Sequence, residues 1–345
     1  MTTTAHPARR VLYSGFHYLH HNPGSGYDAV VADPRHYVSG AQLPFADRLE
    51  STAPRHLNFL LLDLITVLRA LRYDTVHYFY PESTAYLSPW ILRLLGKRIV
   101  YTVHLDDSQW FGETRSVHHR IKQKSMRAAH AIVVLSAQQR DVFHAALPDK
   151  VVSFVPHGFT FDDGSEPPVE LFATRTESPR RLVVVGSNYR DFDMLEQILA
   201  QRGSRPVQID LVGMDEAARS RFRGRDGVVC HPRLDADSYV RLLRESFALL
   251  LPLTFATANN ALFEAYNCYL PAFVSRIDGV TDYVADGDRS LFSSPEEFWS
   301  KYDALAALDA SELREHCIAL NSAARGRFSW DKVRAELAEV YKPDR

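Results

Sequence analysis

Small polar side chains that follow a continuously apolar run form the stretch best suited to chemistry. Residues 247–253 read Phe-Ala-Leu-Leu-Leu-Pro-Leu, which predicts a strand buried in a parallel sheet. Thr257, Ala258, Asn259 and Asn260 come next and lead into a helix. The free N–H groups at a helix start, together with the macrodipole, attract anions, and the hydroxyl and amide groups add donors. We therefore expect a phosphate group at this turn.

Glu264 lies about one turn into the same helix. A carboxylate at that place can accept two hydrogen bonds from a vicinal diol such as a ribose. A nucleoside diphosphate would satisfy the phosphate and the diol features together. The alternative is an ordinary capped helix whose Glu264 faces solvent.

A second polar turn follows another apolar run, at residues 186–191, which read Gly-Ser-Asn-Tyr-Arg-Asp. Arg190 is its one obvious cation, and a guanidinium can grip two phosphate oxygens at once. Because the turn lies between a predicted strand and a predicted helix, we assign Arg190 to the phosphates, with Ser187 beside it in the same turn. A surface arginine is the alternative.

The loop after the predicted strand 98–104 combines acids with aromatic rings. Asp106 or Asp107 could orient an acceptor hydroxyl or take its proton, and the face of Trp110 suits a sugar. His104 ends the strand and is expected to face the ligand crevice. The alternatives are solvated loop acids and a hydrogen-bonded core histidine.

The first loop, residues 17–28, is long, polar and glycine-bearing. In an open α/β sheet the ligand crevice lies beyond the carboxyl ends of the strands, and glycine permits close approach. Gly26 is therefore a candidate for close approach to a substrate, and His17 and Tyr18 are candidates for binding a hydroxyl-bearing acceptor. A zinc site on His17, His20 and His21 is a further possibility, but no fourth ligand is evident. We expect no metal here and prefer hydrogen bonding to a sugar, or loop packing.

Strands and helices alternate along the whole chain, which predicts βαβ units and parallel sheets. With 345 residues the chain exceeds a comfortable single core, so two domains are expected. The predicted strands lie at residues 10–16, 73–80, 98–104, 131–135, 179–186, 207–213, 247–253 and 272–275.

The segment ANNALFEAYNCYLPAFVSRIDGV resembles the donor-binding segment of the retaining glycosyltransferases of family 4, which have the GT-B fold. It supplies the second glutamate of the family pattern as Glu264, the proline as Pro271, and a Gly-Val turn at 279–280. It departs from that pattern at Ala256, where the family has its first glutamate, and at Tyr269, where it has a glycine. The family's first glutamate approaches the transferred sugar, so the sugar contacts are the doubtful part of the resemblance.

The resemblance implies two Rossmann-like parallel-sheet domains that face each other across a cleft. Residues 1–165 would bind the acceptor, residues 166–326 the nucleotide sugar, and residues 327–345 would form a helix that returns to the first domain. It also implies that His104 lies beside the reacting sugar and that Gly26 belongs to a loop near the donor. His231, Arg233 and Leu234 match the element that receives the nucleobase.

The expected activity is transfer of a sugar from a nucleotide diphosphate sugar to a hydroxyl acceptor, with His104, Arg190 and Asp107 as catalytic residues. Retention and independence of metal and of any cofactor follow from the resemblance. Because Ala256 cannot be a nucleophile, a front-face mechanism is preferred, and an inverting reaction with His104 or an aspartate as base stays open. The rivals are a catalytically silent GT-B protein that binds a sugar nucleotide or a partner enzyme, and an epimerase or phosphorylase on the same fold.

The composition limits the partners. A net charge of −2 argues against a nucleic-acid binder, and three separated cysteines fit a reducing, cytoplasmic setting. The polar start and the lack of a spanning apolar run give the same expectation. Membrane contact is expected to be peripheral at most. A surface of Tyr18, Trp90, Arg93, Lys97 and Arg98 was considered for it, but a solvated helix end explains most of them better.

Overall fold

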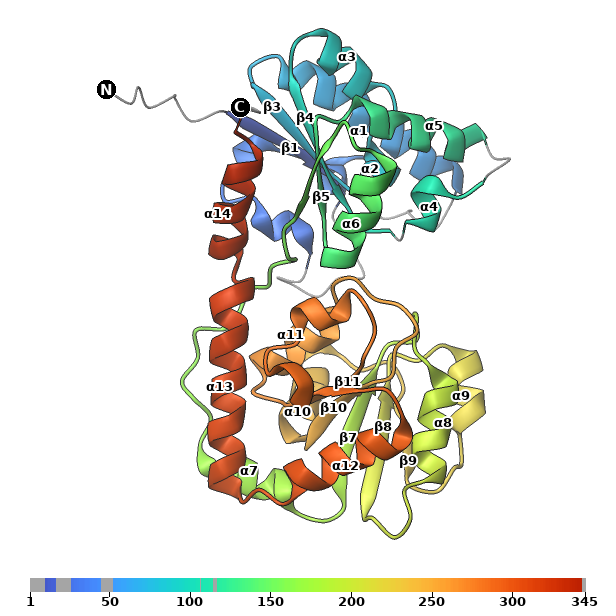
Figure 1. The fold of residues 1–345 in the computed structure, drawn as a ribbon, viewed down its shortest axis with the longest axis vertical. Coiled ribbons are helices and arrows are strands. Elements are labelled where there is room, and N and C mark those ends of the chain that lie inside the picture. The colour runs from blue at the N-terminus through green and yellow to red at the C-terminus, as the bar shows by residue number, and fades with distance from the viewer. Residues whose placement is uncertain (1–9, 17–25, 45–51, 106, 114–116, 343–345) are drawn as a thin grey trace. The chain divides into compact units, whose positions relative to one another are not determined.

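The computed structural model describes residues 10–16, 26–44, 52–105, 107–113 and 117–342. They form two units, shown in Figure 1: the chain up to Thr160 with the segment from Phe328 onward, and residues 161–327. Each unit is built on one six-stranded sheet in which every pair of neighbouring strands is parallel. The sequence interpretation placed the two boundaries at residues 165 and 326.

The N-terminal sheet has the strand order β2-β1-β3-β4-β5-β6. Its strands are short runs rich in apolar residues; the central ones are buried on both faces, as parallel strands require, and the last strand, at the sheet edge, is partly exposed. They are β1 (Val11–Gly15), β2 (Tyr37–Ser39), β3 (Thr75–Phe79), β4 (Arg98–Val103), β5 (Ala131–Val134) and β6 (Val151–Phe154). The helices of this unit are α1 (Thr52–Ala70), α2 (Pro81–Thr84), α3 (Ser88–Leu94), α4 (Ser108–Phe111), α5 (Val117–Ser125), α6 (Ala137–Ala146) and α14 (Trp330–Val340).

Two helical layers cover this sheet. Alternate residues of a strand point to opposite faces, so Ile132 of β5 packs under the layer that contains α1, α3 and α6, while Val133 packs on the other side. That other side is covered by the short helix η1 (Tyr27–Val30) and by α14, which contributes Trp330 to the core. The C-terminal helix therefore completes the N-terminal unit.

The C-terminal sheet has the order β12-β11-β10-β7-β8-β9. Its strands are β7 (Arg180–Val185), β8 (Val207–Val212), β9 (Val228–Cys230), β10 (Ala248–Leu251), β11 (Ala272–Ser275) and β12 (Leu291–Phe292). Its helices are α7 (Val169–Thr176), α8 (Phe192–Ala200), α9 (Glu216–Phe222), α10 (Ala236–Glu245), α11 (Asn260–Asn267), α12 (Pro295–Ala306) and α13 (Ala310–Phe328). An aromatic core of Phe172, Phe247, Phe298 and Trp299 packs beneath this sheet.

Candidate functional site

The C-terminal sheet has a switch in strand order between β7 and β10. From β7 the chain proceeds outward to β8 and β9, and it then returns to β10 on the other side of β7 before it proceeds to β11 and β12. In open parallel sheets, ligands bind beyond the carboxyl ends of the strands at such a point. The loop after β7 contains Ser187 and Arg190, and the loop after β10 contains Thr257 and Asn259. The topology therefore brings the two predicted phosphate-binding turns to one place.

Backbone hydrogen bonds join these two loops. The Asp191 N–H donates to the Pro252 carbonyl at 2.9 Å, and the Thr254 N–H donates to the Tyr189 carbonyl at 3.0 Å. Arg190 forms an isolated antiparallel bridge with Leu253 between these bonds. The position of Arg190 is thus fixed relative to the loop that leads into α11.

The Arg190 guanidinium folds back over its own turn. Nε donates to the Val185 carbonyl at 2.8 Å, and Nη1 donates to the Asn188 carbonyl at 3.0 Å. Burial lowers the pKa of the Arg190 side chain to about 10, so the group stays charged at neutral pH. Among the described residues no carboxylate pairs with it. A poorly solvated cation without a protein anion is suited to bind an external anion.

Gly186, four residues earlier, allows this fold-back. Its φ is +75°, a backbone conformation that residues with a β-carbon rarely adopt. Ser187 links the turn to the loop after β8, because its hydroxyl accepts from the N–H of Asp215, the N-cap residue of α9, at 2.9 Å. Ser187 is therefore held at the same edge of the sheet as Arg190.

The N-terminus of α11 has no side-chain cap. Asn259 is the N-cap residue and is only 9% exposed, but its side chain makes no capping hydrogen bond. Its carbonyl accepts from the Leu262 N–H at 3.1 Å. The first N–H groups of the helix have no acceptor within the helix, and no acidic side chain lies in its first turn. Thr257 and Ala258, directly before it, are half-buried. This helix start can receive a phosphate.

Glu264 is oriented by a residue that the sequence interpretation did not select. The Tyr239 hydroxyl of α10 donates to Glu264 Oε2 at 2.5 Å. Burial, and then the nearby Glu264 carboxylate, raise the pKa of Tyr239, so the hydroxyl stays protonated and keeps donating. The positive charge of Arg190 acts on the same tyrosine, which places all three side chains in one electrostatic neighbourhood. The only indication of Tyr239 in the sequence is its position on a helix that follows His231.

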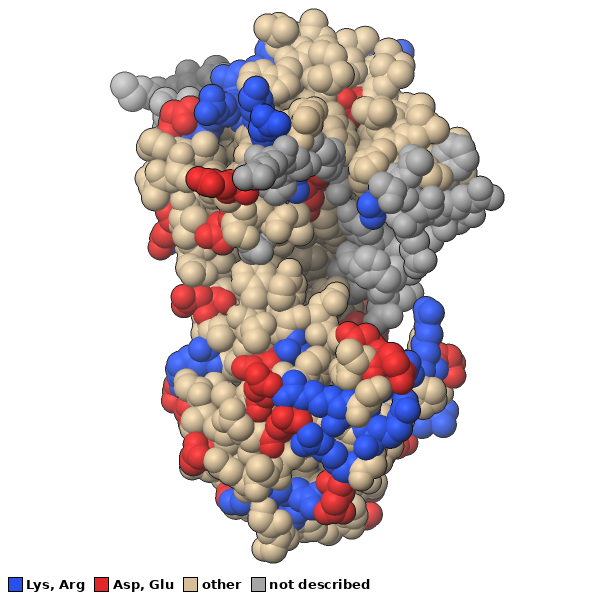
Figure 2. Space-filling view, turned by 90° about the vertical axis from the view of Figure 1, so that its right-hand side faces the viewer, with Lys and Arg blue, Asp and Glu red and all other residues tan. Residues whose placement is uncertain are grey.

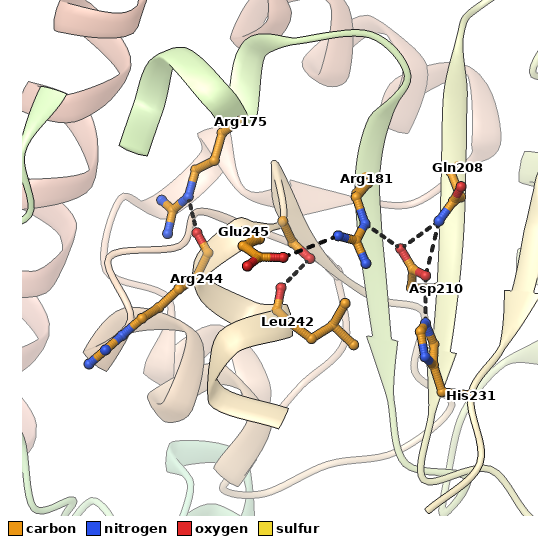
Figure 3. A network of polar contacts seen from close by, with 9 residues as sticks. Arg175, Arg181, Gln208, Asp210, His231, Leu242, Arg244 and Glu245 are labelled. Carbon is orange, nitrogen blue, oxygen red and sulfur yellow. Dashed lines mark hydrogen bonds and ion pairs between the residues drawn. The ribbon is translucent and has the colours of Figure 1, made fainter. Parts of the chain in front are cut away.

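His231, which was expected beside the nucleobase, has a partner inside the protein. Figure 3 shows its ring directed at Asp210 of β8, with Nε2 at 2.6 Å from Oδ1. Asp210 is fully buried and also accepts from Arg181 Nε at 3.1 Å and from Gln208. The orientation of the His231 ring is thus fixed by a side chain of strand β8. Arg233 after β9 is exposed, and Leu234 is half-buried.

His104 lies after β4 in the N-terminal unit, within an aromatic cluster. Its ring stacks on Tyr80 with centroids 4.0 Å apart, and it meets the edge of Tyr27 at 5.1 Å. The Tyr27 hydroxyl is bonded to Thr102 at 3.3 Å, so the ring that faces His104 is itself held in place. Gly26 begins the short helix η1 and is buried.

The remaining acceptor candidates have different settings. Asp107 is exposed and precedes α4. Trp110 is only 2% exposed and packs in the core, with Lys122 Nζ 5.6 Å from its ring centroid. This ring packs inside the unit and offers no face to a ligand, contrary to the sequence expectation. His17, Tyr18 and Asp106 lie outside the described residues.

A buried acid near this end of the sheet was also missed. Glu82 of α2 is 9% exposed, and its Oε2 has no hydrogen-bond partner among the described residues. Burial raises the pKa of the Glu82 carboxyl to about 7, while the charge of Lys122 acts in the opposite direction. No motif marked this residue, because its burial depends on packing by distant segments.

Two kinds of feature are absent from the described residues. No group of three His, Cys, Asp or Glu side chains could hold a metal ion. No helix combines the length and the apolar composition needed to cross a membrane.

Comparison with known families gives one match. Residues 19–162 match the model of Glycosyltransferase Family 4, which is less than half of the 345 residues. No curated protein matches the chain.

Solved structures resemble the chain over nearly its whole length. HepE of Anabaena in complex with UDP and glucose has a TM-score of 0.68 at 16% identity and covers 96% of this chain and 99% of its own. The trehalose-6-phosphate phosphatase N-terminal domain of Candida albicans has a TM-score of 0.69 at 12% identity, with 97% and 98% covered. Sucrose-phosphate synthase from Thermosynechococcus elongatus has a TM-score of 0.59 at 14% identity, with 96% and 88% covered. At these identities the likeness shows the fold, which is GT-B.

Proposed function

We propose that this GT-B chain transfers a sugar from a nucleoside diphosphate sugar to a hydroxyl group of an acceptor. The observation that carries the proposal is the poorly solvated Arg190 guanidinium, which pairs with no carboxylate among the described residues and lies in a turn joined by backbone hydrogen bonds to the loop that leads into the uncapped start of α11. Both are positive features, and both lie at the strand-order switch of the C-terminal sheet. The match of residues 19–162 to Glycosyltransferase Family 4 supports the same reading.

In this proposal the diphosphate binds at the start of α11 and Arg190 stabilises the charge that develops as the sugar leaves. A well-placed donor of this kind is worth about 3 kcal/mol of barrier. We propose that Arg190 and the helix start supply this charge without a metal ion. Turnover should then persist in an excess of EDTA.

Glu264 is proposed to accept hydrogen bonds from the ribose hydroxyls, in an orientation set by Tyr239. The backbone around Arg233 and Leu234 is proposed to receive the base. UDP-glucose is the donor to test first, because it is present in the structure of Anabaena HepE that resembles this chain. We propose that the carboxylate of Asp107 binds the acceptor. We propose that the imidazole of His104 contacts the reacting sugar.

Retention through a front-face mechanism is the proposed stereochemistry. Ala256 carries no nucleophile, so a double displacement through this position is excluded, and the departing phosphate oxygen would help to deprotonate the acceptor. Arg190→Ala should therefore cut turnover far more than Ala256→Glu changes it. Near-native turnover of both variants would contradict the phosphate assignment.

A catalytically silent protein that binds a sugar nucleotide is the second candidate, and Ala256 is the observation that favours it. The two candidates differ in what happens to bound UDP-glucose. A transferase without its acceptor should release UDP and glucose slowly by hydrolysis, and Arg190→Ala should abolish this release. Tight binding without any release of UDP, with and without a panel of hydroxyl acceptors, would favour the silent protein.

A further inference from the structure

Exposed large apolar side chains are few in the C-terminal unit. Among its described residues they are Val169, Tyr189 and Val229, whereas charged side chains of both signs are spread over the face of this unit in the lower part of Figure 2. Single exposed valines are ordinary on a protein surface. Tyr189 is different, because it directly precedes Arg190 in the loop after β7 and is 56% exposed. A large ring is thus exposed beside the cation assigned to the phosphates.

Tyr189 forms an aromatic pair with Phe255, which lies in the loop after β10. The ring centroids are 5.1 Å apart and the ring planes make an angle of 64°, close to the edge-to-face arrangement that aromatic rings favour. Phe255 is half-buried, and β10 is the neighbour of β7 in the sheet. The loops after two adjacent strands therefore present one aromatic surface, at the edge of the sheet where Arg190 lies.

The backbone holds this pair in a fixed geometry. Tyr189 has a φ of +57°, a left-handed conformation that residues with a β-carbon seldom adopt and that clusters at ligand-binding sites. Its carbonyl accepts from the Thr254 N–H at 3.0 Å and from the Thr254 hydroxyl at 3.3 Å. Because Thr254 is the residue before Phe255, these bonds join the main chains that carry the two rings. Rings that are in place before a ligand arrives lose little conformational entropy on binding.

The strand order indicates which part of a ligand the pair faces. The proposed position of the nucleobase, around Arg233, follows β9, and the proposed diphosphate lies between the loops after β7 and β10. In a nucleoside diphosphate sugar the two phosphates separate the base from the glycosyl group. Along the order β10-β7-β8-β9 the glycosyl group therefore lies on the side away from β9, where the loop after β10 contains Phe255.

We propose that the aromatic pair packs on the apolar face of the transferred sugar, a hexopyranose, and so distinguishes the glycosyl donor from the free nucleotide; this inference rests on the proposed function. One face of a hexopyranose has several C–H groups, whose hydrogens are weakly positive, and the face of an aromatic ring is negative. Contact between the two also removes apolar surface from water. Because Ala256, next to Phe255, has no polar side chain, the two rings are the side chains of this segment best suited to hold a sugar.

Calorimetric titration of UDP and of UDP-glucose into matched variants tests this assignment. The two ligands share the nucleoside diphosphate, so the ratio of their dissociation constants reports on the glycosyl group alone. Tyr189→Gly removes the ring and suits the left-handed backbone. It should bind UDP-glucose about tenfold more weakly than the wild type does, and UDP within about twofold. Phe255→Leu, which keeps an apolar side chain, should shift the same ratio by about fivefold.

Two controls separate the ring from its surroundings. Tyr189→Phe keeps the ring and removes the hydroxyl, so its ratio should equal that of the wild type within about twofold. A Tyr189→Phe variant that behaves like Tyr189→Gly would assign the effect to the hydroxyl and overturn the packing proposal. Val169→Ala shortens an apolar side chain that is 40% exposed at the start of α7, and it should leave both affinities unchanged.

An unchanged ratio in Tyr189→Gly and Phe255→Leu would overturn the proposal, and so would an equal loss of UDP and UDP-glucose, which would place the ring against the nucleotide. Wild-type protein that binds UDP but none of UDP-glucose, UDP-galactose and UDP-N-acetylglucosamine would overturn it as well. If the wild type prefers ADP or GDP, that nucleotide and its glucose conjugate are compared in the same way. No binding of any nucleoside diphosphate to the wild type would instead contradict the proposed function itself.

Discussion

At the scale of single residues, the candidate site depends on where Arg190 and Glu264 find their partners. The arginine is held by carbonyl groups, which position it without neutralising it. The glutamate accepts a hydrogen bond from a tyrosine hydroxyl, which orients its carboxylate. An ion pair between the two would have satisfied both groups within the protein. Because Arg190 and Glu264 have different hydrogen-bond partners, the proposed site can use the first for the diphosphate and the second for the ribose.

The role of Glu264 can be tested by removing its proposed ligand groups. We expect 2′,3′-dideoxy-UDP to bind the wild type about tenfold more weakly than UDP does, because the ribose hydroxyls then no longer bond to a carboxylate. In Glu264→Ala the two nucleotides should bind equally. Calorimetric titration of both ligands to both proteins measures this coupling. The same discrimination in wild type and variant would show that the carboxylate does not contact the ribose.

The buried Glu82 carboxyl should make the free energy of unfolding depend on pH. Its folded-state pKa is raised to about 7 from the ordinary 4.5. Between these values the unfolded chain has lost a proton that the folded chain keeps, so stability falls as pH rises through this window and then levels off. Glu82→Gln should remove this loss, and the variant should be more stable than the wild type at pH 8 by up to about 3 kcal/mol, with no difference near pH 4.

Urea unfolding across this pH range, followed by tryptophan fluorescence, measures the effect. A Glu82→Gln variant that is less stable than the wild type at pH 8 would indicate instead that the ionised carboxylate is stabilised by Lys122.

At the scale of elements, the sequence predicted best those strands and helices that are determined by residues close together in the chain. The runs that form β4, β5, β7 and β8 are rich in valine, isoleucine and leucine and were recognised within about one residue. Ser136 is the N-cap residue of α6, and its hydroxyl accepts from the Gln139 N–H at 3.1 Å. The strands β2 and β12 were missed because three and two residues are too few to show a period.

Features that depend on distant residues were not predictable in this way. Tyr239 and Glu264 are 25 positions apart, and Trp110 became a core residue only through packing of its loop against α5.

The turn at Gly279 packs against the loop after β10. Gly279 has a φ of +89°, and a β-carbon there would lie 2.1 Å from the Ala256 carbonyl oxygen. Gly279→Ala should therefore displace the start of α11 and weaken UDP binding by at least about tenfold, because both the backbone conformation and the contact are lost.

Gly326→Ala is the matched control for this change. Gly326 lies inside α13 with open space around it, so the alanine should stabilise the protein by about 0.5–1 kcal/mol and leave UDP binding intact. Calorimetry and thermal unfolding measure the two effects. Unchanged UDP affinity in Gly279→Ala would show that the turn does not support the binding loop.

At the scale of the whole molecule, the end of the chain stabilises its beginning. Trp330 of α14 is 6% exposed, and its ring lies 5.7 Å from that of Tyr27 and 5.3 Å from that of His157. Its close approach to Gly158 leaves no room for a β-carbon there. The sequence resemblance implied a returning helix, but not which side chains would anchor it.

Trp330→Ala should cost the N-terminal unit about 3–5 kcal/mol, because a large buried ring leaves a cavity. UDP binding to the C-terminal unit should remain within about twofold, since the units have separate cores. Trp90→Ala, which removes a 40% exposed ring, should change stability by less than about 0.5 kcal/mol. Urea unfolding of both variants measures these differences, and equal losses would contradict the assignment of α14 to the N-terminal core.

The nucleotide site itself is tested most directly by calorimetric titration of UDP into the wild type, Arg190→Ala and Arg205→Ala. Arg205 is a matched control, because it precedes β8 at the opposite end of the strands and is paired with Asp303 at 2.7 Å. We predict that the wild type and Arg205→Ala bind UDP alike and that Arg190→Ala binds it roughly 10- to 100-fold more weakly, as expected for the loss of a charged hydrogen bond. Equal affinity of Arg190→Ala and the wild type, or no binding of UDP or of any other nucleoside diphosphate to the wild type, would contradict the account.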